Sequence, residues 1–283
     1  METRQPDNRT VVVAMSGGVD SSVAAGLLLR QGFDVYGLTL LICPPAPESV
    51  KQGASSQAEE DARLAARRLG IPHRVVDVRE EFEERVIRDF VDEYARGRTP
   101  NPCIRCNEQV KFRALFDEAY SLGAGWISTG HYARVECGPA GDYLLKRALN
   151  AEKDQSYMLY RLGQAELARA IFPLGGLRKD AIRELAREMG MPNADRPDSQ
   201  EICFVGPGGY REFIASRRPE LVRDGDVVDL DGRPLGRHQG TIGFTIGQRK
   251  GLGVAAEAPL YVVGIDARSN TVIAGPEEAL MAR

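Results

Sequence analysis

The feature that most constrains this chain is a short apolar run that stops at a pair of glycines. Residues 10–15 (TVVVAM) precede 16–22 (SGGVDSS), and apolar residues then recur at helical spacing as far as Gln31. A β-branched run of this length is typical of a buried parallel strand, and Gly32 suits the end of a helix. The sequence therefore predicts a strand that turns directly into a helix, which is the start of a βαβ unit.

The same alternation continues through the first half of the chain. Further strands are expected at 33–42, 73–78 and 125–130, and helices at 58–69, 80–96 and 108–122. A loop with several prolines is expected at 43–57, and a Pro-rich break at 97–107. Strands that alternate with helices form a parallel, doubly wound sheet, which binds ligands beyond the carboxyl ends of its strands. We therefore expect an α/β fold with its site at that edge.

The pattern changes after Tyr132. A hairpin is expected at 134–147, short helices at 155–190, and short alternating runs from Gly225 onwards, such as 259–266 (PLYVVGID) and 270–275 (NTVIAG). We predict two domains: an α/β domain over residues 1–204 and a small β-rich domain over residues 205–283.

Composition narrows the class of protein. With 43 % hydrophobic and 27 % charged residues in 283, the chain is globular rather than disordered or fibrous. No stretch approaches the roughly 20 apolar residues of a membrane span, and the polar start is unlike a secretory signal, so we expect a cytoplasmic protein without a membrane partner. The net charge is −3, so a nucleic-acid site would have to be a local basic face.

The segment 16–22 has the chemistry of a phosphate-binding loop. Glycines allow a tight turn and present backbone N–H groups, serine hydroxyls add donors, and a helix N-terminus favours an anion. A Walker loop carries a lysine for the terminal phosphates, and no lysine follows here. The loop is therefore better suited to holding a pyrophosphate that leaves, which indicates adenylation. The alternative is that these residues only cap a helix.

The five cysteines are unevenly spaced, which argues against a disulfide framework and for chemistry or metal ligation. Cys103 and Cys106 are expected on a Pro-stiffened loop, with Cys106 just ahead of a helix whose N-terminus lowers a thiol pKa. The pair could be half of a zinc site or two inert buried thiols, although the three histidines are scattered. Cys203 is a third candidate, whereas Cys43 and Cys137 belong to no motif.

The strand and loop at 10–22 resemble those of the PP-loop ATP pyrophosphatases, which include GMP synthetase, NAD synthetase and tRNA thiolases. Five more segments follow in order: GRTPNPCIRCNEQVKF (97–112), TGHYAR (129–134), AEKDQSYML (151–159), PDSQEICFV (197–205) and GTIGFTIGQRKGLGV (240–254). Together they resemble the bacterial tRNA-specific 2-thiouridylases over about residues 10–275. One segment alone would not be specific, but five in this order are.

The resemblance implies a set of site residues. The ATP-binding residues would be Ala14, Met15, Ser16, Gly17, Gly18, Val19, Asp20, Ser21, Leu40 and Gly130. The residues facing the target base would be Asn101, Pro102 and Cys103. The tRNA contacts would be His131, Lys153, Asp154 and Gln155, the last three in a helical region that starts near residue 150. Without the surrounding motifs, His131 would be read as a strand-end residue and 153–155 as a solvated turn.

The resemblance also implies an activity, the ATP-dependent 2-thiolation of the wobble uridine of tRNA, with ATP converted to AMP and pyrophosphate. ATP and Mg²⁺ would be the cofactors, and tRNA and a sulfur-donor protein or sulfide source the partners. Cys106 would be the nucleophile and Cys203 the persulfide carrier. Many relatives carry aspartate where Cys103 stands, so Cys103, Cys106 and Cys203 could instead ligate a four-iron four-sulfur cluster.

Two other functions stay open at this point. A PP-loop synthetase that adenylates a small molecule would not need the cysteines, and a non-catalytic tRNA-binding protein would release no pyrophosphate. Members of the family usually continue into a further β-barrel domain that grips tRNA. Since this chain stops soon after residue 275, that C-terminal barrel is expected to be absent.

Overall fold

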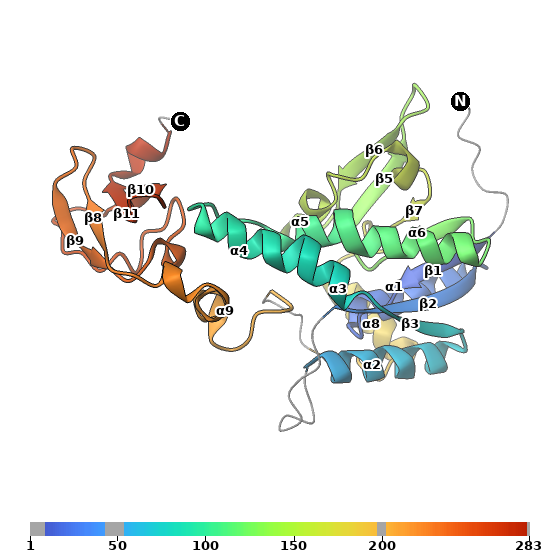
Figure 1. The fold of residues 1–283 in the computed structure, drawn as a ribbon. Helices are drawn as coiled ribbons and strands as arrows, with labels where there is room; N and C mark the ends of the chain where they lie inside the picture. Colours follow the sequence, from blue (N-terminus) through green and yellow to red (C-terminus); the bar gives the residue numbers. More distant parts are fainter. Residues whose placement is uncertain (1–8, 43–53, 197–201, 282–283) are drawn as a thin grey trace. The chain divides into compact units, whose positions relative to one another are not determined.

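The structure is a computed structural model that describes residues 9–42, 54–196 and 202–281 (Figure 1). The chain divides into two compact units: unit 1 is Met1–Arg85 with Cys103–Gln200, and unit 2 is Val86–Pro102 with Glu201–Arg283. The predicted division at residue 204 remains a prediction about domains. The structure adds that the helical run expected at 80–96 is shared, since α3 (Arg79–Phe82) lies in unit 1 and α4 (Arg88–Ala95) in unit 2.

Unit 1 is built on a parallel sheet of five strands in the order β3-β2-β1-β4-β7. The strands are β1 (Thr10–Ala14), β2 (Asp34–Leu41), β3 (His73–Asp77), β4 (Trp126–Ser128) and β7 (Ala170–Ile171). The predicted α/β, doubly wound class is confirmed. The strand order reverses on either side of β1, so the loop after β1 lies at the switch point where such sheets bind ligands.

Helices cover both faces of this sheet (Figure 1). One face carries α1 (Val19–Arg30), α2 (Ala54–Leu69) and α8 (Lys179–Glu188), and the other carries α6 (Phe112–Ser121). Val11 and Val13 pack in the first core and Val12 in the second, as the alternation of side chains along a strand requires. Helix α2 begins at Ala54, so the loop expected at 43–57 is wrong over residues 54–57, and residues 43–53 lie outside the described chain.

The cysteine segment is helical, which corrects the expected break at 97–107. Helix α5 (Pro102–Cys106) continues into a π-helical segment, η2 (Asn107–Lys111), and then into α6. Proline starts a helix readily because its fixed φ suits the first turn, where its missing N–H is not needed. Cys106 therefore lies inside a helical run rather than ahead of one, and Cys103 occupies the first turn. The expected effect of a helix N-terminus on Cys106 does not hold.

Shorter elements complete unit 1. The predicted hairpin is confirmed as the antiparallel pair β5 (Ala133–Cys137) and β6 (Tyr143–Arg147). The region expected to hold short helices contains η4 (Ser156–Met158), α7 (Gln164–Leu167) and α8, after η3 (Ala151–Lys153). It also supplies β7, whose two residues are too few to show a strand pattern in sequence.

Unit 2 is the predicted small β-rich domain. Its sheet has the order β10-β11-β8-β9, formed by β8 (Gly225–Val228), β9 (Pro234–His238), β10 (Tyr261–Asp266) and β11 (Thr271–Gly275). Val227, Val262 and Val272 are fully buried in its core. Helix α9 (Gly209–Arg217) packs against α4 through aromatic rings, since the Phe90 and Phe213 centroids are 6.5 Å apart. Three single turns, η5 (Pro219–Leu221), η6 (Thr241–Gly243) and η7 (Glu277–Met281), complete the unit.

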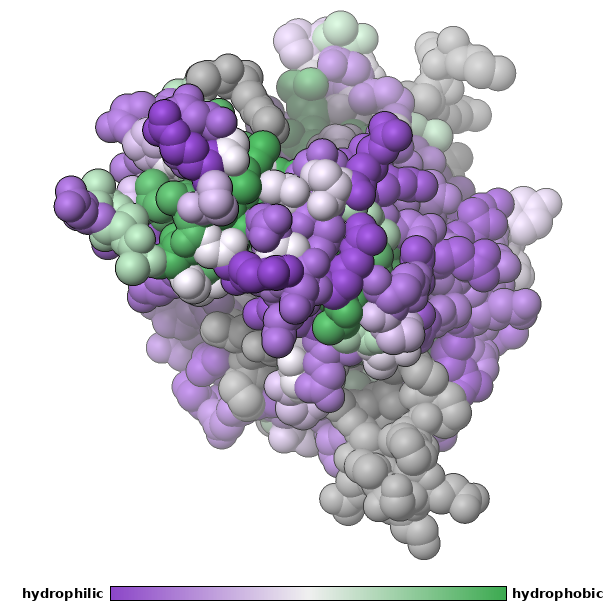
Figure 2. Space-filling model, turned by 60° about the vertical axis from the view of Figure 1, so that its left-hand side comes forward, coloured by the Kyte–Doolittle hydropathy of each residue, from purple (hydrophilic) through white to green (hydrophobic). Residues whose placement is uncertain are grey.

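The surface is mainly hydrophilic in the face shown in Figure 2, with hydrophobic residues gathered in one area. Over the described ranges, none of the helices combines the length and the apolar character needed to cross a membrane.

Candidate functional site

The loop between β1 and α1 is shaped by its glycines and serines. Gly17 has a φ of +75°, and a Cβ there would lie 2.2 Å from the backbone oxygen of Ala58, so only glycine fits. Ser21 folds back over the loop: its Oγ accepts the Ser16 N–H at 3.1 Å and donates to the Gly18 oxygen at 3.1 Å. The loop is therefore held in one conformation by its own side chains, which leaves little to reorganise when a ligand binds.

Gly130 brings the end of the fourth strand against this loop. A Cβ at Gly130 would lie 2.7 Å from the backbone nitrogen of Ser21 and 2.9 Å from the backbone carbon of Asp20. The two backbones can touch because Gly130 has no side chain to hold them apart. Gly130, which the sequence placed with the loop, therefore lies against it in the structure.

Asp20 receives two partners that lie far away in sequence. Lys179 Nζ is 2.8 Å and 2.9 Å from the two carboxylate oxygens, and the Tyr132 hydroxyl donates to Oδ1 at 2.8 Å. The side chains of Lys179 and Asp20 are only 13 % and 29 % exposed, so solvent screens this pair less than a surface pair. The cation that the loop motif lacks is therefore supplied by the first residue of α8.

Asn193 closes the other side of the loop. Its buried side-chain amide donates to the Gly17 oxygen at 2.8 Å and to Ser22 Oγ at 3.1 Å. Since α8 and the residues that follow it supply both Lys179 and Asn193, this segment acts as a clamp on the loop. Sequence reasoning missed both residues, because nothing in an amphipathic helix or in its exit turn indicates a partner more than a hundred positions earlier.

The strand end that carries Leu40 also supports the loop. Thr39 Oγ1 donates to the Met15 oxygen at 2.7 Å, so it must accept the Nε2–H of His73 at 2.8 Å. Burial lowers the pKa of His73, and Arg63 lowers it further, against a smaller opposing effect of Glu59. His73 is thus a neutral donor at pH 7, and it fixes the Met15 end of the loop through Thr39. Leu40 itself is partly buried against the second core.

A chain of hydrogen bonds runs from this loop to the cysteine helix. The Tyr132 backbone N–H donates to Gln155 Oε1 at 3.0 Å, and its oxygen accepts the Gln155 N–H at 2.9 Å. Three residues beyond Gln155, the Met158 oxygen accepts a hydrogen bond from the Asn107 side-chain amide at 3.1 Å. Since Asn107 follows Cys106 directly, the nucleotide loop and the cysteine helix belong to one connected polar framework within unit 1.

The residues predicted to contact tRNA, 153–155, are held in place by the fold of unit 1. Burial opposes ionisation of Asp154, yet the N–H groups of Ala148 and Ser156 and the Ser156 hydroxyl hold its pKa below the ordinary value. Gln155 is bonded to the Tyr132 backbone, and Lys153 ends η3. Their role in tRNA binding stays a prediction.

His131 is buried rather than presented to solvent. Its Nδ1 is 2.7 Å from Thr129 Oγ1, and its ring lies 6.4 Å from the ring centres of both Phe112 and Phe172. Burial lowers the pKa of His131 well below its usual value, and the Lys111 charge lowers it further. The predicted contact between His131 and tRNA also stays a prediction, since the ring is covered in this structure.

The residues predicted to meet the target base and the sulfur differ in position. Asn101 is exposed and Pro102 is buried, while Cys103 and Cys106 are half-buried on α5. Their spacing of three puts both thiols on one face of the helix. Cys203 is exposed in unit 2, and residues 197–201 of its motif lie outside the described chain.

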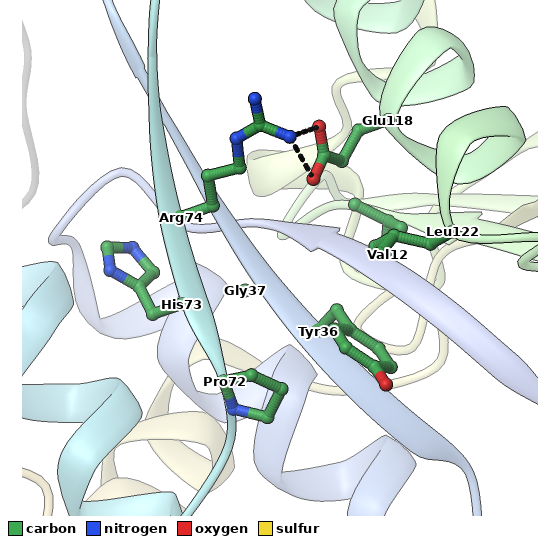
Figure 3. A pocket seen from close by; sticks show the side chains of 8 residues that line it. All are labelled: Val12, Tyr36, Gly37, Pro72, His73, Arg74, Glu118 and Leu122. Carbon is green, nitrogen blue, oxygen red and sulfur yellow. Dashed lines mark hydrogen bonds and ion pairs between the residues drawn. The ribbon is translucent and has the colours of Figure 1, made fainter.

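A separate cavity of about 200 Å³ lies over the sheet beside α6 (Figure 3). Its floor is apolar, and at its rim Arg74 Nη1 lies 3.0 Å and 3.2 Å from the two carboxylate oxygens of Glu118. The lining residues are Val12, Tyr36, Gly37, Pro72, His73, Arg74, Glu118 and Leu122. None of them comes from the loop at 16–22, so this cavity is not part of the site.

Comparison with known proteins decides the family. Residues 9–207 match the model of the tRNA methyl transferase HUP domain, and residues 211–276 match that of the tRNA methyl transferase PRC-barrel domain. The chain is 51 % identical over 279 residues to the tRNA-specific 2-thiouridylase MnmA of Methylobacterium sp. (strain 4-46), covering 98 % of this chain and 73 % of that protein. This chain belongs to the tRNA-specific 2-thiouridylase family.

Other members of the family match over a similar length. The MnmA of Azorhizobium caulinodans is 52 % identical over 280 residues, with 98 % of this chain and 72 % of that protein covered. Among solved structures, a 4-thiouridine synthetase in complex with RNA and ATP is 20 % identical to this chain. The TM-score is 0.45, and the match covers 75 % of this chain and 50 % of that one. The PRC-barrel match places the family's second domain on the sheet of unit 2.

The cysteines of this chain do not form a metal centre among the described residues. Over the part of the chain that the structure describes, no group of three or more histidine, cysteine, aspartate or glutamate side chains lies together as metal ligands would. Cys103 and Cys106 lie in unit 1 and Cys203 in unit 2. The iron-sulfur cluster stays a prediction.

Proposed function

We propose that this chain is an ATP-dependent tRNA-uridine 2-sulfurtransferase that thiolates the wobble uridine. The observation that supports this most is the connection within unit 1 from Asp20, through Tyr132 and Gln155, to Asn107 beside Cys106. Adenylation at O2 and sulfur attack at C2 take place on the same base, and a shared framework keeps the loop and the Cys106 thiol in fixed relation. The family membership supplies the substrate class.

ATP binds with its phosphates at the start of α1. Backbone N–H groups of the loop and the helix N-terminus face the phosphates, in a conformation that Gly17 and Gly130 allow by their close packing against Ala58 and Ser21. Lys179 is within reach of the same position and offsets the negative charge of pyrophosphate as it leaves. These contacts favour attack at the α-phosphate, because they stabilise the leaving group rather than a transferred terminal phosphate.

Mg²⁺ fits this site by the chemistry of its donors. Asp20 offers a carboxylate and Ser16 and Ser21 offer hydroxyls, and hard oxygen donors such as these are the ones that Mg²⁺ prefers. Asp20, Ser16 and Ser21 would hold Mg²⁺, which would neutralise phosphate charge there.

The sulfur step follows adenylation. The uracil O2 attacks the α-phosphorus, pyrophosphate leaves, and C2 then carries an adenylated oxygen. The terminal sulfur of a persulfide on Cys203 attacks C2. The Cys106 thiolate then attacks the inner sulfur on Cys203 to form a disulfide, the electron pair of the broken S–S bond stays on the transferred sulfur, and that sulfur forms the C2=S double bond as AMP leaves. An external dithiol reduces the disulfide, and the freed Cys203 thiolate takes the outer sulfur of a persulfide on a donor protein, whose own cysteine leaves as a thiolate.

The test is mass spectrometry of nucleosides from tRNA incubated with the protein, ATP and a sulfur source. We expect 2-thiouridine at the wobble position together with one pyrophosphate for each thiolated tRNA. Pyrophosphate released with a small molecule and without tRNA would instead identify a small-molecule synthetase. Tight tRNA binding without pyrophosphate release would identify a non-catalytic binding protein.

A further inference from the structure

The turn at 154–160 is rigid and is bonded both to Tyr132 and to the cysteine helix. Asp154 ties it to Ala148 and Ser156, and Gln155 bonds the Tyr132 backbone in both directions. The Met158 N–H donates to the Gln155 oxygen at 3.0 Å, and Leu159 is fully buried. A turn fixed at both ends presents its outward side chains in a defined direction.

The outward side chains of this turn are aromatic. Tyr157 is 50 % exposed and Tyr160 is 62 % exposed, on either side of the buried Leu159. A tyrosine buries much apolar area at low conformational cost, so two of them exposed together on a rigid turn mark a contact surface rather than part of the core.

Two contacts place these tyrosines beside the cysteine helix. The Asn107 side-chain amide donates to the Met158 oxygen at 3.1 Å, and Arg161 Nη2 is 2.9 Å from Glu108 Oε1. Asn107 and Glu108 follow Cys106 directly, while Met158 and Arg161 adjoin Tyr157 and Tyr160. The turn and the helix are therefore fastened together at two points along their length.

Two guanidinium groups lie beside this surface. Arg105 and Arg161 share one carboxylate, that of Glu108, and Asp154 adds a second carboxylate on the turn. The guanidinium groups can bind the phosphates of an RNA strand. Burial raises the pKa of Tyr157, and Cys103 and Asp154 raise it further, so its hydroxyl stays a donor at neutral pH.

We propose that Tyr157 and Tyr160 form a stacking surface for unpaired bases of the RNA next to the cysteine helix. The inference rests on the proposed function and adds the site that would hold the unpaired bases around the target uridine. Proteins recognise single-stranded RNA by stacking its splayed bases on aromatic side chains, with cations for the phosphates. An extruded uridine leaves its neighbours unstacked, and two exposed rings beside the cysteine helix replace that lost stacking.

The experiment uses the full chain and a synthetic anticodon stem-loop RNA. The RNA carries 2-aminopurine at the loop position 3′ to the target uridine, because its fluorescence is quenched by stacking. We expect Tyr157→Ala and Tyr160→Ala to bind this RNA about 5- to 100-fold more weakly and to quench less. Tyr157→Phe keeps the ring and retains both signals. The matched control is Tyr120→Ala, whose tyrosine is 87 % exposed and lies about 20 Å further along the same helical run from Cys106.

The outcomes separate stacking from other roles. Affinity and quenching within twofold of the wild type in both alanine variants would overturn the proposal. An equal loss in Tyr157→Phe would also overturn it, since the hydroxyl rather than the ring would then matter. Pyrophosphate release with tRNA is measured on the same wild-type protein. If the wild type releases none, the proposed function fails whatever the tyrosines do, whereas an active wild type with unaffected alanine variants removes only this inference.

Discussion

Lys179 Nζ lies 2.8 Å and 2.9 Å from the two carboxylate oxygens of Asp20, although the two residues are separated by 159 positions in the chain. The pair joins the first residue of α8 to the first turn of α1, and the Tyr132 hydroxyl shares the same carboxylate. A loop whose own motif contains no lysine thereby acquires one from the fold.

Lys179→Met should slow adenylation. Removing a cation that faces the leaving pyrophosphate is expected to lower tRNA-dependent pyrophosphate release by about 10²- to 10³-fold, with Lys179→Arg less affected because it keeps the charge. Release is measured with a coupled pyrophosphate assay at saturating ATP. The control is Arg178→Ala, one residue away, where the side chain is 79 % exposed and pairs with Asp180. Equal rates for Lys179→Met and Arg178→Ala would refute this role.

Gly130→Ala should disturb the nucleotide loop. The new Cβ would lie 2.7 Å from the Ser21 backbone nitrogen, and backbone cannot move aside as a flexible side chain can. We expect a loss of stability of about 1–3 kcal/mol together with weaker ATP binding, measured by thermal unfolding with and without ATP. Gly176→Ala is the matched control, since a Cβ there meets no atom within 4 Å. If the Gly130→Ala protein were as stable as the Gly176→Ala protein, Gly130 would not lie against the Ser21 backbone as the structure shows.

Acid should destabilise the protein from about pH 6.5 downward. The pKa of His131, buried between Phe112 and Phe172, is lowered by burial first and by Lys111 second. Below about pH 6.5, the ordinary pKa of histidine, His131 binds a proton in the unfolded chain but not in the folded one. The contribution of His131 to the free energy of unfolding is therefore fully present above that pH, and it is lost as the pH falls toward the pKa of the folded state. The expected slope is up to about 1.4 kcal/mol per pH unit for this proton.

The contribution of His131 is measured by chemical unfolding at pH 7.5 and pH 5.5. His131→Phe keeps an aromatic ring in the same packing but cannot be protonated, so its stability should differ less between the two pH values than that of the wild type. His73 and His238, whose pKa values burial also lowers, continue to contribute in both proteins. An unchanged pH difference in the variant would show that His131 is not responsible.

The cysteines should separate adenylation from sulfur transfer. Cys106→Ser and Cys203→Ser are expected to lose 2-thiouridine formation by at least about 10³-fold while retaining tRNA-dependent pyrophosphate release, because neither thiol is needed for the attack on ATP. Nucleoside mass spectrometry and the pyrophosphate assay are run on the same samples. Cys137→Ser is the control, since Cys137 is exposed at the end of β5 and belongs to no motif. Full thiolation by either variant would rule out these roles.

Iron content distinguishes the two sulfur routes. The persulfide route predicts a colourless, iron-free protein that is fully active after anaerobic purification. Absorption in the visible range together with about four irons per chain would instead support the cluster on Cys103, Cys106 and Cys203. The readout is ultraviolet-visible absorption with iron analysis, and Cys103→Asp should leave activity unchanged under the persulfide route and abolish it under the cluster route.

Much of the architecture could be predicted because short runs of residues indicate their own secondary structure. Val11, Val12 and Val13 form a β-branched run that only a buried strand accommodates, and SGGVDSS directly after it leaves few ways to continue other than a turn into a helix. The helix at the cysteines was missed, because prolines at 100 and 102 indicate a break when they stand alone, whereas Pro102 here starts α5. Pattern alone does not distinguish a proline that ends a segment from one that begins a helix.

Short segments of the sequence were enough to predict the α/β order of unit 1, the position of the loop at 16–22 and the thiols available for chemistry, because periodicity, glycine placement and residue type are local properties. Three findings needed the packed fold: Lys179 and Asn193 bind the loop, His131 is buried, and the turn that carries Tyr157 is bonded to the cysteine helix. Those contacts join residues that are distant in the chain, and they exist only once the two cores of the sheet have packed.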